Sequence, residues 1–426
     1  MATVTPTCVL LCVAMVIPAV AEDVTDDHGI VRYVVSQPNT PIPTPLPPTV
    51  PTPPDVVLQP SVRVQPGLTV GQPSGSSRFG FGLLVTRQSP RISFRLSSMP
   101  NMFGDWYMRD EEMMIEDPPV NIISDVPTAG GIRRLKVSEN NHPLPTDRVF
   151  LNYQRFNNAL RFDTDPTGAT RFGDVDVDRY TLGFERRIFN GRTSVELRLP
   201  LSSSFEVQDS TFAMTGGSVG NLTILMKQLL LLTDSSALAV GLGINTPTGD
   251  NVIASVNGDV FSIRNDSVYL MPFVGFQSAP TDRFFYQGFM QWDFATNGNR
   301  VEILSPGPVT SAGTFTGQNL MHFDFSSGYW LYRNLDATVT GLAFLGELHY
   351  TTTLQNTDVV VANLPSGATA TLRNGANRVD PLNLTIGLHL EVLLNTALRV
   401  GAAFPLKGAD DRFFDSEIIL QLNRRY

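Results

Sequence analysis

The sequence predicts an all-β protein, a closed antiparallel transmembrane β-barrel of about twelve strands with an N-terminal Pro-rich extension. Three observations predict this fold. Alternating apolar and polar residues recur from Arg148 onward, the connections between these stretches are alternately short and long, and the last strand ends on the aromatic Tyr426. Successive side chains of a strand point to opposite faces, so a barrel wall in lipid needs this alternation.

The composition agrees with a chain that is rich in strands and turns. Of 426 residues, 34 are Gly and 31 are Pro, and only 17% are charged. No run of roughly 20 apolar residues follows the first segment, so a helical membrane protein is not expected. The net charge of -9 argues against general nucleic-acid binding, and we expect no nucleic-acid partner.

The start of the chain has the features of an export signal. An apolar stretch beginning at Cys8 ends in Ala19-Val20-Ala21, a small-residue cleavage pattern. Residues 1–21 are therefore predicted to be a cleaved signal peptide, which directs the protein to the outer membrane of a Gram-negative-type bacterium. Both cysteines, Cys8 and Cys12, lie in this signal, so the mature chain offers no thiol for a disulfide or a metal.

Two further segments precede the predicted barrel. Residues 22–66 are predicted to be a Pro-rich periplasmic linker, because their run of prolines favours extended polyproline II. Residues 67–146 are predicted to form an N-terminal periplasmic or plug segment, in which Met99 to Met108 is rich in Met and aromatic residues. Such a stretch can enter a barrel mouth as a plug or pack at the periplasmic rim, and we favour the rim.

Residues 147–426 are predicted to form the outer-membrane barrel. Alternation is clear from Leu382 to Val392, where Leu and Ile on one face are separated by polar residues on the other. One stretch contains Leu229-Leu230-Leu231-Leu232, which does not alternate and also fits a helix. The twelve predicted strands are 148–158, 175–188, 193–203, 220–233, 236–246, 266–277, 284–295, 319–332, 336–352, 380–394, 396–406 and 414–426.

The lengths of the connections support the barrel over a soluble sandwich. Outer-membrane barrels have short periplasmic turns and long external loops, whereas a sandwich has no reason to separate loop lengths by parity. The short connections are 189–192, 234–235, 278–283, 333–335 and 395. The long connections are 159–174, 204–219, 246–265, 296–318 and 353–379.

Aromatic residues gather near the short-turn ends of the predicted strands. Membrane barrels carry a girdle of aromatic side chains at each interface with water. The predicted interfacial aromatics are Phe276, Phe284, Tyr286, Trp330, Tyr332 and Tyr426, with Phe189 in the first short turn.

Several stretches resemble an uncharacterised outer-membrane β-barrel family, porin-like and found in planctomycete-type bacteria. They are Met102 to Asp105, Leu144 to Asn158, Gly183 to Glu185 and Ser194 to Pro200. The resemblance covers roughly the last three quarters of the chain and implies a location and a fold. It brings no catalytic residue, because none is established for the family.

The polar faces of the strands predict the residues that line the lumen. Charged side chains on these faces would set the charge along a path for solutes. Glycines on the same faces, such as Gly387 and Gly401, are expected to leave room inside. The predicted lumen and selectivity residues are Glu196, Arg198, Asp293, Glu347, His349, His389, Glu391 and Arg399.

Two pairings of these residues follow from possible strand registers. Glu347 and His349 could align with Glu391 and His389 to form a site for a divalent ion or a response to pH. We favour ordinary lumen polarity, since the register across a long loop is open. A three-residue turn at Leu394 to Thr396 would place Arg399 directly opposite Glu391, and we predict that pair.

The sequence predicts a porin-like channel for passive or weakly selective passage of small solutes. A structural or adhesive barrel without an open pore is the main alternative. A barrel-type lipid hydrolase is a weaker one, for which His322 and Ser326 share the lumen face. We expect no enzyme activity, no cofactor and no metal. The expected partners are outer-membrane lipid, the small solutes, and the barrel-assembly machinery, which would bind the C-terminal strand.

Overall fold

The computed structural model describes residues 92–105, 111–117, 120–126, 134–163, 171–203, 205–208, 212–305, 307–374, 378–408 and 411–426. All of them belong to one unit, Ser77–Tyr426. The predicted signal peptide and Pro-rich linker lie outside the described residues. Among the residues described, no helix is long and apolar enough to cross a membrane.

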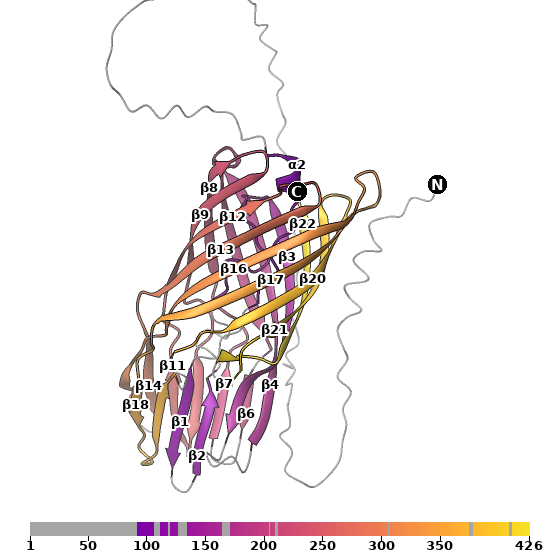
Figure 1. The fold of residues 1–426 in the computed structure, drawn as a ribbon. Helices are drawn as coiled ribbons and strands as arrows, with labels where there is room; N and C mark the ends of the chain where they lie inside the picture. The colour runs from indigo at the N-terminus through magenta and orange to yellow at the C-terminus, as the bar shows by residue number, and fades with distance from the viewer. Residues whose placement is uncertain are drawn as a thin grey trace, which may run out of the picture. The chain divides into compact units, whose positions relative to one another are not determined.

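Twelve antiparallel strands close into a barrel, which confirms the predicted fold class (Figure 1). The strands are β3 (Arg148–Asp163), β4 (Arg171–Ile188), β5 (Thr193–Ser202), β8 (Thr223–Leu232), β9 (Ser236–Asn245), β12 (Tyr269–Ser278), β13 (Phe284–Ala295), β16 (Asn319–Arg333), β17 (Val339–Gln355), β20 (Leu382–Val392), β21 (Thr396–Pro405) and β22 (Ser416–Arg425). They match all the predicted strands. The wall closes because β3 pairs with both β4 and the C-terminal β22.

The wall turns its apolar side chains outward. On β20, Ile386 and Leu388 are each 41% exposed on the outside, whereas Thr385 and His389 are buried in the interior. This is the reverse of a soluble protein and matches a barrel that meets lipid on its outer face. The two-residue alternation of the sequence therefore has the orientation that a membrane requires.

The Leu-rich run of β8 is a strand and not a helix. The pairing of β8 with β9 shifts between Leu229 and Leu231. This bulge leaves Leu230 and Leu231 both on the outside, 48% and 62% exposed. A bulge adds one residue to one strand, so it accounts for the break in alternation.

Four of the five long connections, expected to be loops, form hairpins. The hairpins are β6 (Phe205–Gln208) with β7 (Phe212–Gly216), β10 (Val252–Val256) with β11 (Asp259–Ile263), β14 (Asn299–Ser305) with β15 (Thr310–Phe315), and β18 (Val360–Asn363) with β19 (Thr369–Arg373). Six of the eight strands join in one sheet, in the order β15-β14-β11-β10-β7-β6. Such short strands give only a weak alternating signal, so the sequence did not reveal them.

The N-terminal segment enters the barrel from the end that carries the short turns. Helix α2 (Phe94–Ser97) lies at this end, beside the C-terminus (Figure 1). The hydroxyl of Ser93 donates to the backbone oxygen of Asp234, in the short turn between β8 and β9. Met99 to Asp105 then lie inside the barrel and are buried. The described part of the Met-rich stretch, Met99 to Asp105, therefore lies in the lumen and not at the rim, which we favoured; Trp106 to Met108 lie outside the described residues.

The segment reaches the far end of the barrel and returns. Its hairpin, β1 (Glu112–Asp117) and β2 (Val120–Asp125), lies at the end opposite α2 (Figure 1). There β1 pairs with β19, and β2 pairs with the last residues of β3. Residues 134–146 pass back through the interior to the start of β3. We call the two lumenal stretches, 99–105 and 134–146, the plug.

The lumen glycines accommodate side chains and do not leave an opening. A Cβ built on Gly387 would lie 2.5 Å from the ring of Phe103 in the plug, and one on Gly401 would lie 3.1 Å from it. The ring of Phe150 approaches Gly183 in the same way, and that of Phe273 approaches Gly241. In the described residues, the space expected of these glycines is therefore filled by aromatic rings.

Candidate functional site

The carboxylate of Glu347, on β17, holds the backbone of the plug. It accepts hydrogen bonds from the backbone N–H groups of Phe103, at 2.9 Å, and Gly104, at 3.2 Å. Ser326 Oγ donates to it at 3.1 Å, and His349 Nε2 lies 3.2 Å away. Hydrogen bonds to a charged acceptor are stronger than neutral ones, so this wall residue fixes the inward-going stretch.

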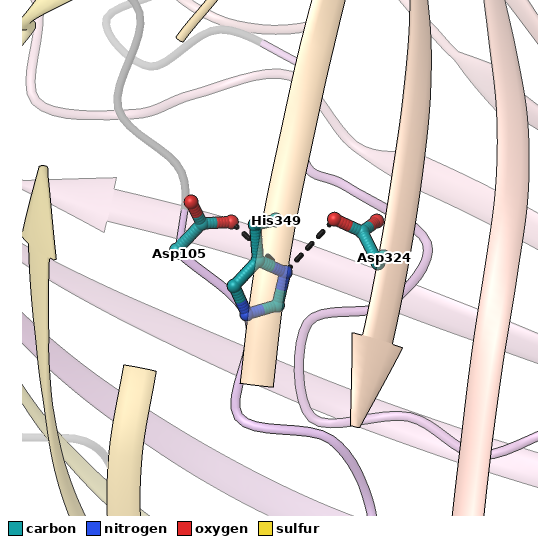
Figure 2. A group of neighbouring side chains, drawn as sticks. All are labelled: Asp105, Asp324 and His349. Atoms are coloured by element: carbon teal, nitrogen blue, oxygen red, sulfur yellow. Dashed lines mark hydrogen bonds and ion pairs between the residues drawn. The ribbon is translucent and has the colours of Figure 1, made fainter. Parts of the chain in front are cut away.

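A buried ion network joins the plug to the wall around Lys136. The Nζ atom of Lys136 lies 2.8 Å from Asp105 Oδ1 and 3.1 Å from Asp324 Oδ1. His349 Nδ1 lies 2.8 Å from Asp324 and 3.3 Å from Asp105, as Figure 2 shows. Lys136 and Asp105 belong to the two stretches of the plug, and Asp324 and His349 to the wall. The network therefore ties both stretches to the barrel.

The same cluster contains the donor set of a metal site. Ligand atoms of Asp105, Asp324 and His349 lie within 4.8 Å of one another, and carboxylate and imidazole groups are common metal ligands. The ammonium of Lys136, however, stands between the two carboxylates, where a cation would bind. The chain thus supplies the positive charge that these carboxylates need, and we treat the cluster as an internal ion network.

The pKa of Lys136 reflects this pairing. Burial would lower the pKa, but the carboxylates of Asp105 and Asp324 outweigh burial and raise it above the ordinary value of 10.5. Below the ordinary pKa of lysine, the interaction of Lys136 with the two carboxylates therefore contributes its full stabilisation. This stabilisation is lost only as the pH rises through the raised pKa of Lys136. Lys136 remains charged across the physiological range.

A second ion network lies on the wall nearer the short turns. Arg148 lies 2.7 Å from Glu185 and 3.1 Å from Glu196. Arg198 lies 2.6 Å from Glu196, and Lys227 lies 3.1 Å from Glu185. These side chains are at most 2% exposed. Within the network, each carboxylate is thus shared by two cations.

The same three cations also bond to the returning stretch of the plug. Arg198 donates to the backbone oxygen of Lys136 at 2.9 Å. Arg148 donates to that of Asn140 at 2.5 Å, and Lys227 to that of His142 at 2.8 Å. These bonds attach the returning stretch through polar groups that water could also satisfy.

All eight predicted lumen residues point inward and are buried. The structure brings Glu196 together with Arg198, and Glu347 together with His349. Asp293 lies 3.2 Å from His322 Nε2. The residues and their exposed fractions are Glu196 1%, Arg198 1%, Asp293 1%, Glu347 1%, His349 1%, His389 3%, Glu391 4% and Arg399 4%.

The predicted pair of Glu391 and Arg399 is wrong. Arg399 lies opposite His389, and Glu391 lies opposite Ala397. The turn begins one residue earlier than predicted, because Leu393 and Leu394 adopt positive φ angles of 53° and 62°. Leucine rarely adopts this conformation, so no residue at these positions indicated the turn.

The alignment of two His and two Glu residues is also absent from the structure. In the pairing of β17 with β20, Glu347 lies opposite Thr385 and His349 opposite Asn383. Glu391 and His389 pair instead with Gly341 and Ala343. These four residues are therefore ordinary polar residues of the lumen, which is the interpretation we favoured.

Five of the predicted interfacial aromatics lie on the outer face, and Trp330 does not. Phe276, Phe284, Tyr332 and Tyr426 are 39%, 41%, 43% and 54% exposed, and Tyr286 is half-buried. Trp330 is 2% exposed and packs edge-on against the ring of His389. It lies on the inward face of β16, and a register shift between Trp330 and Tyr332 then turns the tyrosine outward. The assignment of Trp330 to the girdle is therefore wrong.

The residues of the hydrolase alternative take part in other contacts. Ser326 Oγ donates to Glu347. His322 Nδ1 bonds to Thr351 Oγ1 at 2.8 Å, and its Nε2 to Asp293 at 3.2 Å. The geometry thus gives each side chain a place in the lumen network rather than in a nucleophile–base pair.

Sequence reasoning missed the residues that hold the plug. Asp105 and Lys136 lie in a segment with no periodic signal, and their partner Asp324 is far away in the chain. Glu185 was visible on the polar face of its strand, but its partner Lys227 lies beside the Leu-rich run. Charge alternation could have identified the wall residues, but nothing in the sequence could have paired them with the plug.

We expect acidification to favour release of the returning stretch through His142. Burial, with help from Lys227, lowers the pKa of His142 well below its ordinary value of 6.5. The released stretch would recover that ordinary value, so the closed state loses about 1.4 kcal/mol per pH unit below pH 6.5. This loss ends when the pH reaches the lowered pKa.

Amide hydrogen exchange of residues 134–146 at pH 7 and pH 5 measures this effect. Burial raises the pKa of Glu139, which gives an opposite trend at low pH, so His142→Gln serves as the reference. Exchange protection, corrected for intrinsic rates, should fall more in the wild type than in the variant. Equal losses in both would exclude a role for His142.

No protein-family model matches the sequence, and no curated protein is significantly similar to it. Solved structures show distant similarity. The NanC porin is 9% identical, covers 66% of this chain and 98% of its own, with a TM-score of 0.36. An outer membrane channel from Pseudomonas putida F1 is 11% identical, with 67% and 97% covered and a TM-score of 0.40. The transport unit of the autotransporter AIDA-I from Escherichia coli is 9% identical, with 70% and 94% covered and a TM-score of 0.41. Nothing about the solute is drawn from them.

Proposed function

We propose that the protein is an outer-membrane channel that its own N-terminal segment holds closed. The attachment of the plug carries this proposal: Glu347 and Asp324 of the wall bind the plug backbone and Lys136 through hydrogen bonds and charge. Hydrogen bonds and ion pairs of this kind can be exchanged for water when the plug moves. A small solute would then pass only when the plug moves.

The wall that the plug covers is suited to a solute path. Its buried side chains carry both signs of charge, with Glu196 and Arg198 on β5 and Arg399 on β21. Once hydrated, such side chains would set a weak selectivity by charge. Passage would be passive, driven by the concentration gradient of the solute.

The location and the ends of the chain belong to the same proposal. The apolar exterior of the barrel supports insertion in the outer membrane, after export through the signal at residues 1–21. Residues 22–66 would lie in the periplasm, and the barrel-assembly machinery would bind β22. We also propose membership of the porin-like family of planctomycete-type bacteria that the sequence resembles.

A structural or adhesive barrel is the second candidate, and one observation favours it. Three of the long connections fold into a six-stranded sheet, which would present a rigid surface outside the membrane. Such a protein would need no plug movement and would not conduct.

Current across a planar bilayer distinguishes the two candidates. The wild type should conduct rarely, and a variant with residues 99–105 and 134–146 each replaced by a Gly-Ser linker of equal length should conduct continuously. Protection from protease in vesicles of the same lipid checks that both proteins insert. If the linker variant inserts and remains silent, the channel proposal fails and the structural barrel is favoured.

A further inference from the structure

A small cavity lies between the plug and the wall, beside the short turn that joins β20 to β21. Its volume is about 10 Å³, which is room for about one water-sized sphere. The lining side chains that matter here are Arg148, His389, Glu391, Arg399, Asn423 and Arg425. Most of them point inward from the wall.

Several buried polar atoms at this cavity could form further hydrogen bonds. Within the described part of the chain, no hydrogen-bond partner faces Arg399 Nε, Asn423 Nδ2, Glu391 Oε2 or either ring nitrogen of His389. Asn423 Oδ1 accepts from Arg148 at 3.4 Å, so the amide NH₂ group turns to the other side. Buried polar groups in proteins are nearly always satisfied, so a ligand or a water is expected here.

The charge around the cavity favours an anion over a water. Arg399 donates to the backbone oxygens of Asn101 and Met102, and Arg425 donates to those of Ser97 and Met99. Carbonyl oxygens carry only partial charge, so both guanidinium groups keep most of their positive charge in a buried place.

Carboxylates do not balance these cations locally. Glu391 is the one carboxylate among the described residues that line the cavity. Arg148, the third arginine there, is already paired with Glu185 and Glu196. Glu347 also offsets part of the charge of Arg399, and Glu185 part of that of Arg425. Glu347 is bonded to the plug backbone, and Glu185 is shared by Arg148 and Lys227. An anion in the cavity would compensate the remaining positive charge.

We propose that the cavity binds a small anion of halide size. Arg399 Nε, Asn423 Nδ2 and one ring N–H of His389 donate to it, and Arg425 adds charge. A larger cavity of about 250 Å³ shares Glu391, Leu394 and Arg425 with the small one and gives access from the rim. The anion would bridge wall and plug, because Arg399 also holds the plug backbone. This site does not depend on whether the barrel conducts.

Bromide is the probe that tests the site, because its anomalous X-ray scattering separates it from water. Crystals of the full chain soaked in sodium bromide should show an anomalous peak within hydrogen-bond distance of Arg399 Nε and Asn423 Nδ2. A cavity that holds density without anomalous signal contains water and overturns the proposal.

Thermal unfolding in detergent gives a second measurement. The Tm should rise with bromide concentration relative to sodium gluconate at equal ionic strength, since gluconate is too large for the cavity. Asn423→Leu should lose this rise. Asn152→Leu is the matched control and should keep the rise in Tm. It changes a buried lumen amide that bonds to Asn140 in the plug but does not line the cavity. The same bromide response in both variants would contradict the assignment.

Discussion

Replacing Phe103 with alanine is expected to release the inward-going stretch of the plug. The Phe103 ring is fully buried and fills the hollow beside Gly387 and Gly401. The guanidinium carbon of Arg399 also lies 4.0 Å from the centre of the ring. Loss of a buried phenylalanine side chain costs about 3–5 kcal/mol. The closed state should therefore weaken by roughly two to three and a half powers of ten.

Hydrogen exchange of the amides at 99–105 measures this loss without any assumption about conduction. Protection there should fall by that factor, while the amides of the barrel strands keep theirs. Phe284→Ala is the matched control, because its ring is 41% exposed on the outside and does not touch the plug. Unchanged protection in Phe103→Ala would mean that the ring does not hold the plug.

The same contact can be tested from the wall. A Cβ at Gly387 would lie 2.5 Å from the Phe103 ring and 2.6 Å from the backbone oxygen of Val400, so Gly387→Ala must displace the ring and also strain the β21 backbone. Overpacking of this kind costs about 1–3 kcal/mol. Gly346→Ala introduces the same methyl group on the neighbouring strand, where nothing lies within 4 Å, and should leave the plug in place.

Replacing Lys136 with methionine is expected to have an effect of similar size. The substitution keeps the length of the side chain and removes the charge between Asp105 and Asp324. Two carboxylates would then be buried with only His349 to offset them. Removing one partner of a buried ion pair costs about 3–5 kcal/mol, because the remaining charge is left uncompensated.

The exchange protection of both plug stretches measures this cost. Lys136→Arg keeps the charge and should retain most of the protection. Adding Asp324→Asn to Lys136→Met should restore part of it, because one of the two unmatched carboxylates is gone. If the double variant is no better protected than Lys136→Met alone, the charge imbalance is not the cause.

The barrel wall could be predicted from the sequence because its signal is local. Lipid outside and a polar interior impose a period of two on each strand, and loop length separates the two ends. Even the Leu-rich run of β8 fits once a bulge is allowed. The prediction failed at two places where the backbone departs from a regular strand. Positive φ angles at Leu393 and Leu394 shift the pairing of β20 with β21 by one turn position. Trp330 lies on the inward face of β16, just before a register shift.

The plug could not be predicted, because its contacts have no local pattern. Lys136 and Asp324 are 188 residues apart in the chain, and Phe103 and Glu347 are 244 apart. Only the fold brings them together. The lumen glycines lie on the inner face, but the room expected of them is filled by aromatic rings, including one from a segment that precedes the barrel.

The most direct measurement of the threaded arrangement is the labelling of single cysteines on intact cells. This is possible because both cysteines, Cys8 and Cys12, lie near the start of the chain and the rest of the sequence has none. Glu116→Cys, exposed on β1 at the far end of the barrel, should react with a maleimide that cannot cross the outer membrane. Arg192→Cys, exposed at a short turn, should react only after permeabilisation. If both react only after permeabilisation, the N-terminal segment does not pass through the lumen.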